Sequence, residues 1–377
     1  MKTTPRHLSR RSMVAAAAAG LVTTVVSPAV SPARAADAPA ARFHTVGRVR
    51  RATDGSVRYS WPGVSFEGRF HGTGVGVVLD DADNDYDVQV DGATVATLVT
   101  PGRTVSWVDG LADGVHRIRV VKRTESPWAA GRFGGFVAAR GGVILPSPRA
   151  RRRQIEFIGD SYTAGYGNVS EIRDCSGTGG VHRNSNADLA FGALTARRLD
   201  ADFQINAFSG RGMVRNYNGG EPGTDFRTYY DRALLNVEGD VWRRPRGWCP
   251  QVVVVGLGIN DFSTPLNPGE RWSTTAELVA AYESAYHGFL DELRARYGRG
   301  TFLVVAAARL WNTTALADAT ARIVEERGRR GDGRVSHWYY DDPGLDFLGC
   351  DWHPSLHDHR IISGLLDTHL AGLPLHW

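Results

Sequence analysis

Two residues in this chain have the type and the neighbours that nucleophilic catalysis requires. Ser161 lies in the loop 159–167, which directly follows the strand-like run 155–158, and stands where a helical segment begins, so we expect its hydroxyl to lie exposed beside helix N-terminal amides. His353, near the C-terminus, offers an imidazole that could remove the proton of a serine hydroxyl, and Asp351 lies two residues before it. These residue types match a nucleophile, its general base and an acid that orients the base.

Two further segments contain hydrogen-bond donors suited to a developing negative charge. Gly210, within the sequence Phe-Ser-Gly-Arg-Gly at 208–212, lets a backbone N–H approach a ligand closely. Asn260, within 256–261, can donate from its side chain into the same cavity. Each residue alone has an ordinary interpretation, such as a helix cap for Ser161 or Asn260 and a turn for the glycine. Because all the segments follow strand-like runs, we predict that they form one active site.

The C-terminal part of the chain, residues 154–373, alternates strand-like and helical segments. This alternation predicts a mostly parallel sheet covered by helices on both faces, with its chemistry at the carboxyl ends of the strands. The predicted strands are 155–158, 203–208, 252–257, 302–307 and 335–339. The predicted helices are 187–199, 275–297, 314–329 and 356–370.

The part before it, residues 41–146, repeats apolar residues with period two and contains Asp-Gly turn signals. The segment 75–79 (Val-Gly-Val-Val-Leu) is one example. Roughly eight or nine such strands without a convincing helix predict an all-β sandwich, a jelly roll. Pro146, Pro148 and the arginine-rich segment 149–153 mark the boundary between the two domains.

Residues 1–36 have the pattern of a cleaved export signal. They combine the pair Arg10-Arg11, an apolar stretch at 14–26 and a small-residue site at 33–35. The paired arginines favour the Tat route, and cleavage would release an extracellular protein without a membrane segment. An uncleaved membrane anchor is the alternative, which the short, Ala-rich stretch disfavours.

Composition and cysteine content exclude several classes of protein. The 377 residues are 42% hydrophobic and 22% charged, as in soluble globular proteins, and the formal net charge of +4 lies largely in the leader and the boundary segment. No nucleic-acid partner is therefore indicated. Cys175, Cys249 and Cys350 allow one disulfide, whose pairing the sequence leaves open, or three free thiols. Nothing in the sequence bears on self-association.

The four motif segments resemble the blocks of the SGNH or GDSL hydrolase superfamily, which carry Ser, Gly, Asn and His and match Ser161, Gly210, Asn260 and His353. The resemblance covers 154–373 in order and spacing. It implies a flavodoxin-like three-layer α/β/α domain in which Ser161 attacks an ester carbonyl and His353 removes the serine proton. It also implies an oxyanion hole formed by the Ser161 amide, the Gly210 amide and the Asn260 side chain.

At one point where the chain departs from the superfamily pattern, it resembles a subgroup, carbohydrate esterase family 2. The acid usually lies three residues before the histidine, where this chain has Cys350, whereas Asp351 lies two before it within Asp-Trp-His-Pro. That subgroup also has an N-terminal jelly roll. The resemblance implies a secreted esterase that removes O-acetyl groups from xylan or mannan through an acyl-enzyme, without a cofactor. Some members orient the histidine through backbone carbonyls, so we expect substitution of Asp351 to cost less activity than that of Ser161 or His353.

Substrate contacts follow from the aromatic residues beside the motifs. We predict that Tyr166, Tyr217 and Trp352 contact an acetylated polysaccharide or oligosaccharide, although such rings can equally belong to the core. A broad-specificity esterase or lipase is the alternative of the same class, and a carbohydrate-binding protein with incidental esterase activity is the alternative of another. The sandwich is accordingly a structural brace or a separate binding module.

A metal-dependent deacetylase is a further alternative. Its one dense cluster of ligand types is His357-Asp358-His359, whose i,i+2 spacing on a helix points the two rings apart. We therefore predict no metal site.

Overall fold

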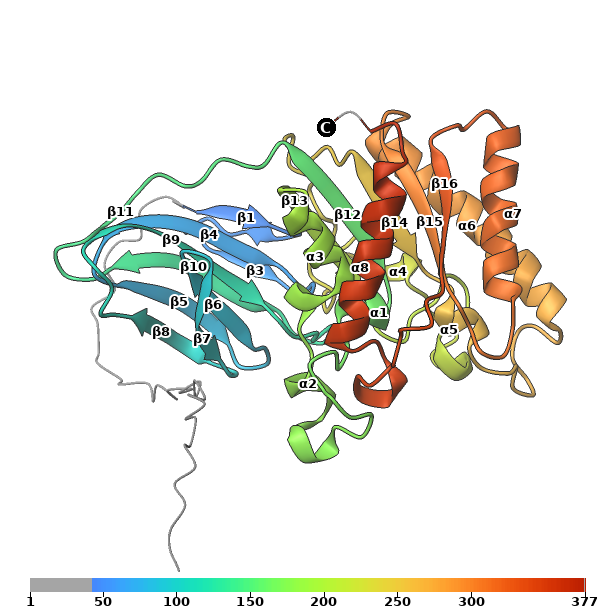
Figure 1. Ribbon diagram of the computed structural model, residues 1–377, viewed down its shortest axis with the longest axis horizontal. Coiled ribbons are helices and arrows are strands. Elements are labelled where there is room, and N and C mark those ends of the chain that lie inside the picture. The colour runs from blue at the N-terminus through green and yellow to red at the C-terminus, as the bar shows by residue number, and fades with distance from the viewer. Residues whose placement is uncertain (1–42, 376) are drawn as a thin grey trace, which may run out of the picture. The chain divides into compact units, whose positions relative to one another are not determined.

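Three β-sheets organise the residues that the computed structural model describes, 43–375 and 377 (Figure 1). The predicted export signal lies outside these residues. In the described part of the chain, no helix combines the length and the apolar composition that crossing a membrane requires.

Two antiparallel sheets form the N-terminal β domain. Their strand orders are β1-β4-β9-β6-β7, with β11 also pairing with β4, and β2-β3-β10-β5-β8. The strands are β1 (His44–Val46), β2 (Arg50–Arg51), β3 (Val57–Tyr59), β4 (Ser65–Gly72), β5 (Val75–Asp81), β6 (Tyr86–Val90), β7 (Ala93–Leu98), β8 (Gly102–Val108), β9 (Gly114–Lys122), β10 (Gly131–Ala138) and β11 (Val143–Ile144). The predicted sandwich is confirmed. The expected number of strands was too low, because two-residue strands such as β2 and β11 are too short to show a period of two.

The third sheet is parallel and has the order β13-β12-β14-β15-β16, which is the flavodoxin-like order 2-1-3-4-5. Its strands are β12 (Arg153–Gly159), β13 (Ala201–Ala207), β14 (Val252–Gly256), β15 (Phe302–Ala308) and β16 (Val335–Tyr340). Every residue of β13 and β15 is buried, as expected for a sheet covered on both faces.

Helices cover both faces of this sheet. The side chains of α3 (Phe191–Arg198) and α8 (Leu356–Ala371) share one hydrophobic cluster with the sheet, and those of α6 (Thr275–Tyr297) and α7 (Ala315–Arg329) share another (Figure 1). The shorter helices are α1 (Ser161–Ala164), α2 (Gly180–Arg183), α4 (Arg227–Tyr230) and α5 (Ile259–Phe262). The three-layer α/β/α prediction is confirmed.

One predicted helix differs from the structure. The segment 187–199 divides into a single 3-10 turn, Ala187–Leu189, and helix α3. Ala190 lies between them with extended dihedral angles, φ −70° and ψ 157°, and serves as the N-cap of α3. An apolar periodicity does not reveal such a break, because alanine suits both conformations.

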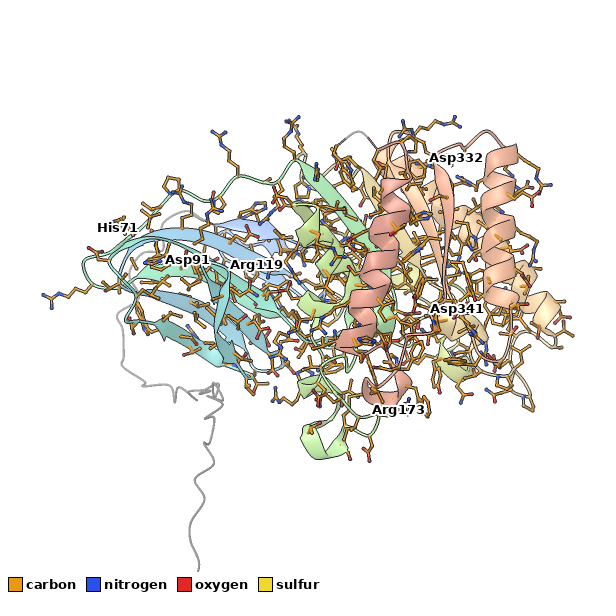
Figure 2. The ribbon with its side chains drawn as sticks, in the orientation of Figure 1. His71, Asp91, Arg119, Arg173, Asp332 and Asp341 are labelled. Carbon is orange, nitrogen blue, oxygen red and sulfur yellow. A yellow bond between two sulfur atoms is a disulfide. The ribbon has the colours of Figure 1, made fainter. Side chains whose placement is uncertain are left out.

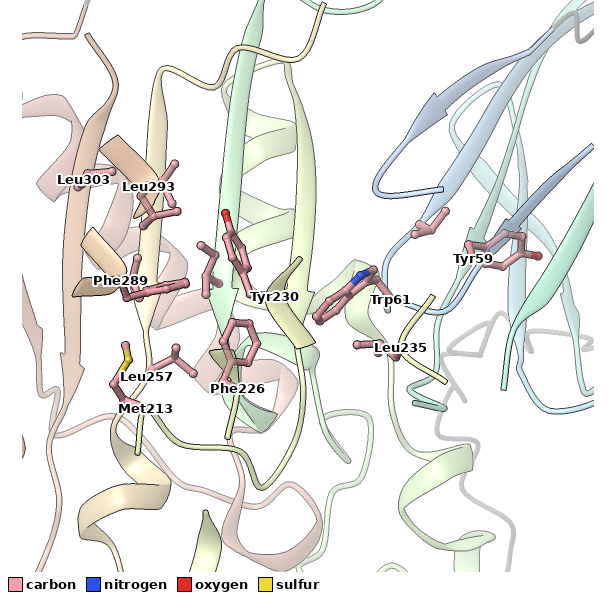
Figure 3. Packing of buried hydrophobic residues seen from close by; sticks show 14 of the residues in the cluster. Tyr59, Trp61, Met213, Phe226, Tyr230, Leu235, Leu257, Phe289, Leu293 and Leu303 are labelled. Atoms are coloured by element: carbon pink, nitrogen blue, oxygen red, sulfur yellow. The ribbon is translucent and has the colours of Figure 1, made fainter. Parts of the chain in front are cut away.

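A shared hydrophobic core joins the β domain to the α/β domain. Trp61, which follows β3, is fully buried and packs near Phe226, at a ring-centroid distance of 6.3 Å (Figure 3). Its indole N–H donates to the carbonyl of Arg232 at 2.9 Å. The two domains therefore bury side chains against each other rather than being joined only by a linker.

A buried ion pair crosses the same boundary. The Arg48 guanidinium donates to Glu156 of β12 at 2.7 Å, and both side chains are fully buried. The guanidinium also stacks between the rings of Tyr230 and Trp242, each at 4.4 Å. Removing one member of such a pair leaves an uncompensated buried charge, so the contact makes the association of the domains specific.

Candidate functional site

The first site residue, Ser161, begins helix α1 directly after β12. Asp160 caps this helix, because its carboxylate accepts the N–H of Tyr162 at 3.1 Å. Ser161 is only 5% exposed, and as the first residue of a helix its own N–H has no partner within that helix. The hydroxyl therefore sits in an enclosed place beside a free amide.

His353 lies against this hydroxyl. Its Nε2 is 2.9 Å from Ser161 Oγ, while its Nδ1 is 3.0 Å from the carbonyl oxygen of Cys350 and 3.2 Å from that of Asp351. Carbonyl oxygens only accept hydrogen bonds, so Nδ1 must carry the proton and Nε2 must present its lone pair. The imidazole is thus in the tautomer that a general base for Ser161 needs.

Burial adjusts the basicity of this imidazole. Removal from solvent lowers the pKa of His353 below the ordinary value of 6.5, and the two backbone carbonyls and the charge of Asp351 oppose that effect. The side chain is consequently neutral, and able to act as a base, at neutral pH.

The loop that supplies the two carbonyls is pinned from several sides. A disulfide joins Cys350 to Cys175, which settles the pairing left open by the sequence and leaves Cys249 as an exposed free thiol. The N–H of Cys350 donates to Gly167 at 3.1 Å, and that of Asp351 donates to Arg173 at 2.8 Å. These contacts hold the turn in place.

The geometry of Asp351 differs from the expected triad. Its φ is 52°, a left-handed conformation, and its carboxylate accepts the hydroxyl of Tyr166 at 2.9 Å. Within the described residues, no hydrogen bond or ion pair joins the carboxylate to His353, which uses the Asp351 backbone instead. The physical reason is the turn itself, which directs the carbonyl rather than the side chain toward the imidazole.

Two of the proposed oxyanion donors, Gly210 and Asn260, follow β13 and β14, the strands on either side of β12. Gly210 follows β13 with φ 79°, which suits glycine, and its carbonyl accepts the N–H of Tyr217 at 2.9 Å. The Asn260 amide donates to the carbonyl of Arg211 at 2.9 Å, while Asp160 Oδ2 lies at a longer 3.3 Å. One amide hydrogen is thus firmly held, and the other makes a weak contact that a substrate oxygen could replace.

Asp261 fixes the segment that follows Gly210. Its carboxylate accepts the N–H groups of Met213, Val214 and Arg215 at 2.8–2.9 Å. Because Asp261 is the next residue after Asn260, the second and third motif segments are locked to each other.

Glu125, a residue of the β domain that the sequence analysis did not single out, also supports this segment. Its carboxylate accepts the N–H of Ser209 at 2.7 Å and the Ser209 hydroxyl. Burial raises the pKa of Glu125, and these hydrogen bonds oppose that shift. No sequence pattern could identify Glu125, because the contact joins residues 84 positions apart in different domains.

The predicted substrate contacts have different surroundings. Trp352 and Tyr217 are 63% and 59% exposed. The guanidinium of Arg173 (labelled in Figure 2) lies over the Trp352 ring at 3.6 Å, so one face of the indole is covered. Tyr166 instead packs on the His353 ring at a centroid distance of 4.2 Å, where it supports the imidazole.

The cluster 357–359 has structural contacts in place of metal ligands. Asp358 forms a capping box with Ser355 at the start of α8. Nδ1 of the buried His359 accepts the N–H of Phe191 at 3.1 Å. In the described range, no group of three or more His, Cys, Asp or Glu side chains is arranged to hold a metal ion.

Replacement of Asp351 by asparagine is expected to lower kcat/KM for nitrophenyl acetate by no more than about ten-fold, because the carbonyls and not the carboxylate hold Nδ1. The acid limb of the pH–rate profile should lie below pH 6.5 in the parent, because burial lowers the pKa of His353 and only neutral imidazole acts as base. Loss of the Asp351 charge should move this limb to lower pH. A loss of about ten-thousand-fold would instead identify Asp351 as an essential triad acid.

Replacement of Glu125 by alanine is expected to lower kcat about ten-fold or more with little change in KM, because the segment carrying the Gly210 amide loses its support. Glu125→Gln keeps an acceptor and should recover most of kcat. Asp54→Ala, which breaks an ion pair with Arg132 inside the β domain, is the control. Equal activity of the alanine and glutamine variants, with unchanged thermal midpoints, would contradict the positioning role.

Comparison with known proteins assigns a family to each part of the chain. Residues 45–148 match the model of the carbohydrate esterase 2 N-terminal domain, and residues 155–333 match that of the GDSL-like lipase/acylhydrolases. The chain is 40% identical over 315 residues, 84% of this chain and 85% of the relative, to an acetylxylan esterase/glucomannan deacetylase of Cellvibrio japonicus. It is 31% identical over 332 residues to the cellulase/esterase CelE of Acetivibrio thermocellus, covering 86% of this chain and 38% of that protein.

Solved structures give the same family. One, described as a carbohydrate esterase whose active site has divergent catalytic and non-catalytic binding functions, has a TM-score of 0.81 at 37% identity and covers 89% of this chain and 99% of its own. A family two carbohydrate esterase from Clostridium thermocellum in complex with cellohexaose has a TM-score of 0.76 at 29% identity, covering 87% and 98%. This chain is a carboxylic ester hydrolase and belongs to carbohydrate esterase family 2.

Proposed function

We propose that the protein is an exported esterase that removes O-acetyl groups from plant polysaccharide, xylan or mannan, through an acyl-enzyme. The observation that carries the proposal is the 2.9 Å contact between His353 Nε2 and Ser161 Oγ, in an imidazole whose other nitrogen is bound to backbone carbonyls. That contact pairs a nucleophile with a base of the correct tautomer.

The first half-reaction acylates the serine. Ser161 Oγ attacks the acetyl carbonyl carbon while His353 Nε2 takes the hydroxyl proton. Hydrogen-bond donors at three strand ends stabilise the negative charge that develops on the carbonyl oxygen. They are the Ser161 and Gly210 amides and the Asn260 side chain. The ester bond then breaks, and His353 returns the proton to the departing sugar oxygen.

The second half-reaction restores the enzyme. Water enters, gives a proton to His353 and attacks the acetyl-serine carbonyl. The same donors stabilise the second tetrahedral intermediate, which collapses to acetate and free Ser161 as the proton returns to Oγ. Ser161 supplies the nucleophile, and His353 serves as base and then as acid in both half-reactions, so no step needs a metal or an organic cofactor.

A polysaccharide substrate is supported by the open aromatic surfaces beside this pair. Trp352 presents one uncovered indole face, and Tyr217 extends from the segment after Gly210. Such rings can stack on the apolar faces of pyranoses. The names of the relatives, an acetylxylan esterase/glucomannan deacetylase among them, support the same substrate class.

Export is supported by two independent features. The leader at 1–36 has the composition of a signal, with paired arginines that favour Tat transport. The disulfide between Cys175 and Cys350 suits an oxidising compartment outside the cytoplasm.

Acetate release from acetylated xylan and from acetylated glucomannan tests the proposal, beside nitrophenyl acetate and nitrophenyl octanoate. We expect release from the polysaccharides, weak octanoate activity and at least a hundred-fold loss in Ser161→Ala, because the nucleophile is removed. Preference for octanoate would favour a broad esterase or lipase. Polysaccharide binding without serine-dependent release would favour a binding protein.

A further inference from the structure

A groove of about 810 Å³ extends from the oxyanion segment to the β domain. Its lining includes Ser209 and Gly210 of the segment that follows β13, and Pro127 and Trp128 of the connection between β9 and β10. Cavities of this size hold ligands considerably larger than an acetyl group. The groove therefore has room for more of a substrate than the reacting ester.

Trp128 is an exposed indole on a fixed support. Its ring is 66% exposed, and its N–H points to Asp83 Oδ1 at 3.4 Å. The hydroxyl of Ser126 donates to Asn84 at 2.7 Å, which anchors the connection within the β domain. The neighbouring Glu125 anchors it to Ser209 in the α/β domain. The indole is thus held at a set distance from the Gly210 amide.

The other aromatic rings of the groove are already covered. Arg211 lies over Phe208 and Tyr229 at 4.7 and 5.1 Å, and Arg232 lies over Tyr229 at 4.8 Å. Neither Trp128 nor Tyr217 makes a ring or cation contact among the described residues. Two free aromatic surfaces therefore remain in the groove, Tyr217 from the α/β domain and Trp128 from the β domain.

Beside apolar residues such as Leu235, the lining contains polar side chains. Thr228, Asn236 and Glu238 contribute a hydroxyl, an amide and a carboxylate to the groove. A ligand that matches this lining has apolar faces for the indole and hydroxyl groups for the polar side chains. Sugar rings have both, whereas a fatty acyl chain offers no hydrogen-bonding groups to the polar part.

We infer that Trp128 of the β domain forms a second sugar-binding subsite, which holds a neutral pyranose unit of the polysaccharide other than the acetylated one. The inference rests on the proposed function and adds that the substrate chain runs across both domains. The sandwich is then both a structural partner of the catalytic domain and a part of the substrate site.

Trp128→Ala tests this subsite through substrate size. We expect kcat/KM for acetate release from acetylated polysaccharide to fall about ten-fold, chiefly through KM, while kcat/KM for nitrophenyl acetate and for an acetylated monosaccharide stays within two-fold. Trp128→Tyr should retain most of the polymer activity, because it keeps an aromatic face. Trp107→Ala is the matched control, since Trp107 is 42% exposed on β8 and does not line the groove.

Three outcomes would overturn the inference. Unchanged polymer kinetics would remove Trp128 from the substrate site. An equal fall for polymer and nitrophenyl acetate would assign it a structural role. A selective loss on nitrophenyl octanoate would make the groove an acyl site. The parent enzyme distinguishes failure of this inference from failure of the proposed function. If the parent released no acetate from the polysaccharide, the proposed function would fail together with the subsite. If the parent released acetate and Trp128→Ala matched it, only the subsite would fail.

Discussion

The hydrogen bonds from the His353 ring to two backbone carbonyls are the constraint on which the rest of the site depends. They place the proton on Nδ1, and so leave Nε2 free to face Ser161 at 2.9 Å. Both carbonyls belong to a turn whose Asp351 and Trp352 have left-handed dihedral angles. Such a turn is strained for non-glycine residues, and the disulfide at Cys350 helps to hold it. Two backbone carbonyls thus occupy the place beside Nδ1 that the carboxylate holds in a Ser-His-Asp triad.

The β domain is integrated into the catalytic unit at several levels. Trp61 belongs to a core that continues into the α/β domain (Figure 3), and Arg48 carries a positive charge into that domain to meet Glu156. Beside the active site, Glu125 holds Ser209. Contacts at the boundary between the domains therefore both stabilise the fold and position residues of the active site. One domain can both support the catalytic domain and bind substrate when its supporting contacts, such as Glu125 to Ser209, lie beside the active site.

The sequence predicted those features that depend on local pattern. Apolar patterns indicated the β-sandwich, the parallel sheet and the long helices, and the bounds of α6 agree with the prediction because its N-cap Thr274 and Gly298 are strong signals. The residues alone did not predict the turn at Asp351, since an aspartate near a histidine in sequence can face the ring with its carboxylate or with its backbone carbonyl. The family resemblance offered the second arrangement. Contacts such as Glu125 to Ser209 join residues distant in sequence, and the free faces of Trp128 and Tyr217 depend on which rings arginines cover.

Nitrogen-15 NMR of histidine-labelled protein at about pH 8, well above the ordinary histidine pKa, tests the central claim most directly. The His353 signals can be assigned by comparison with His353→Gln. We expect neutral His353 to carry its proton on Nδ1 and to have an unprotonated Nε2, in the parent and in Asp351→Asn alike. A proton on Nε2, or loss of the Nδ1-protonated form in Asp351→Asn, would contradict it, because the carboxylate and not the backbone would then set the tautomer.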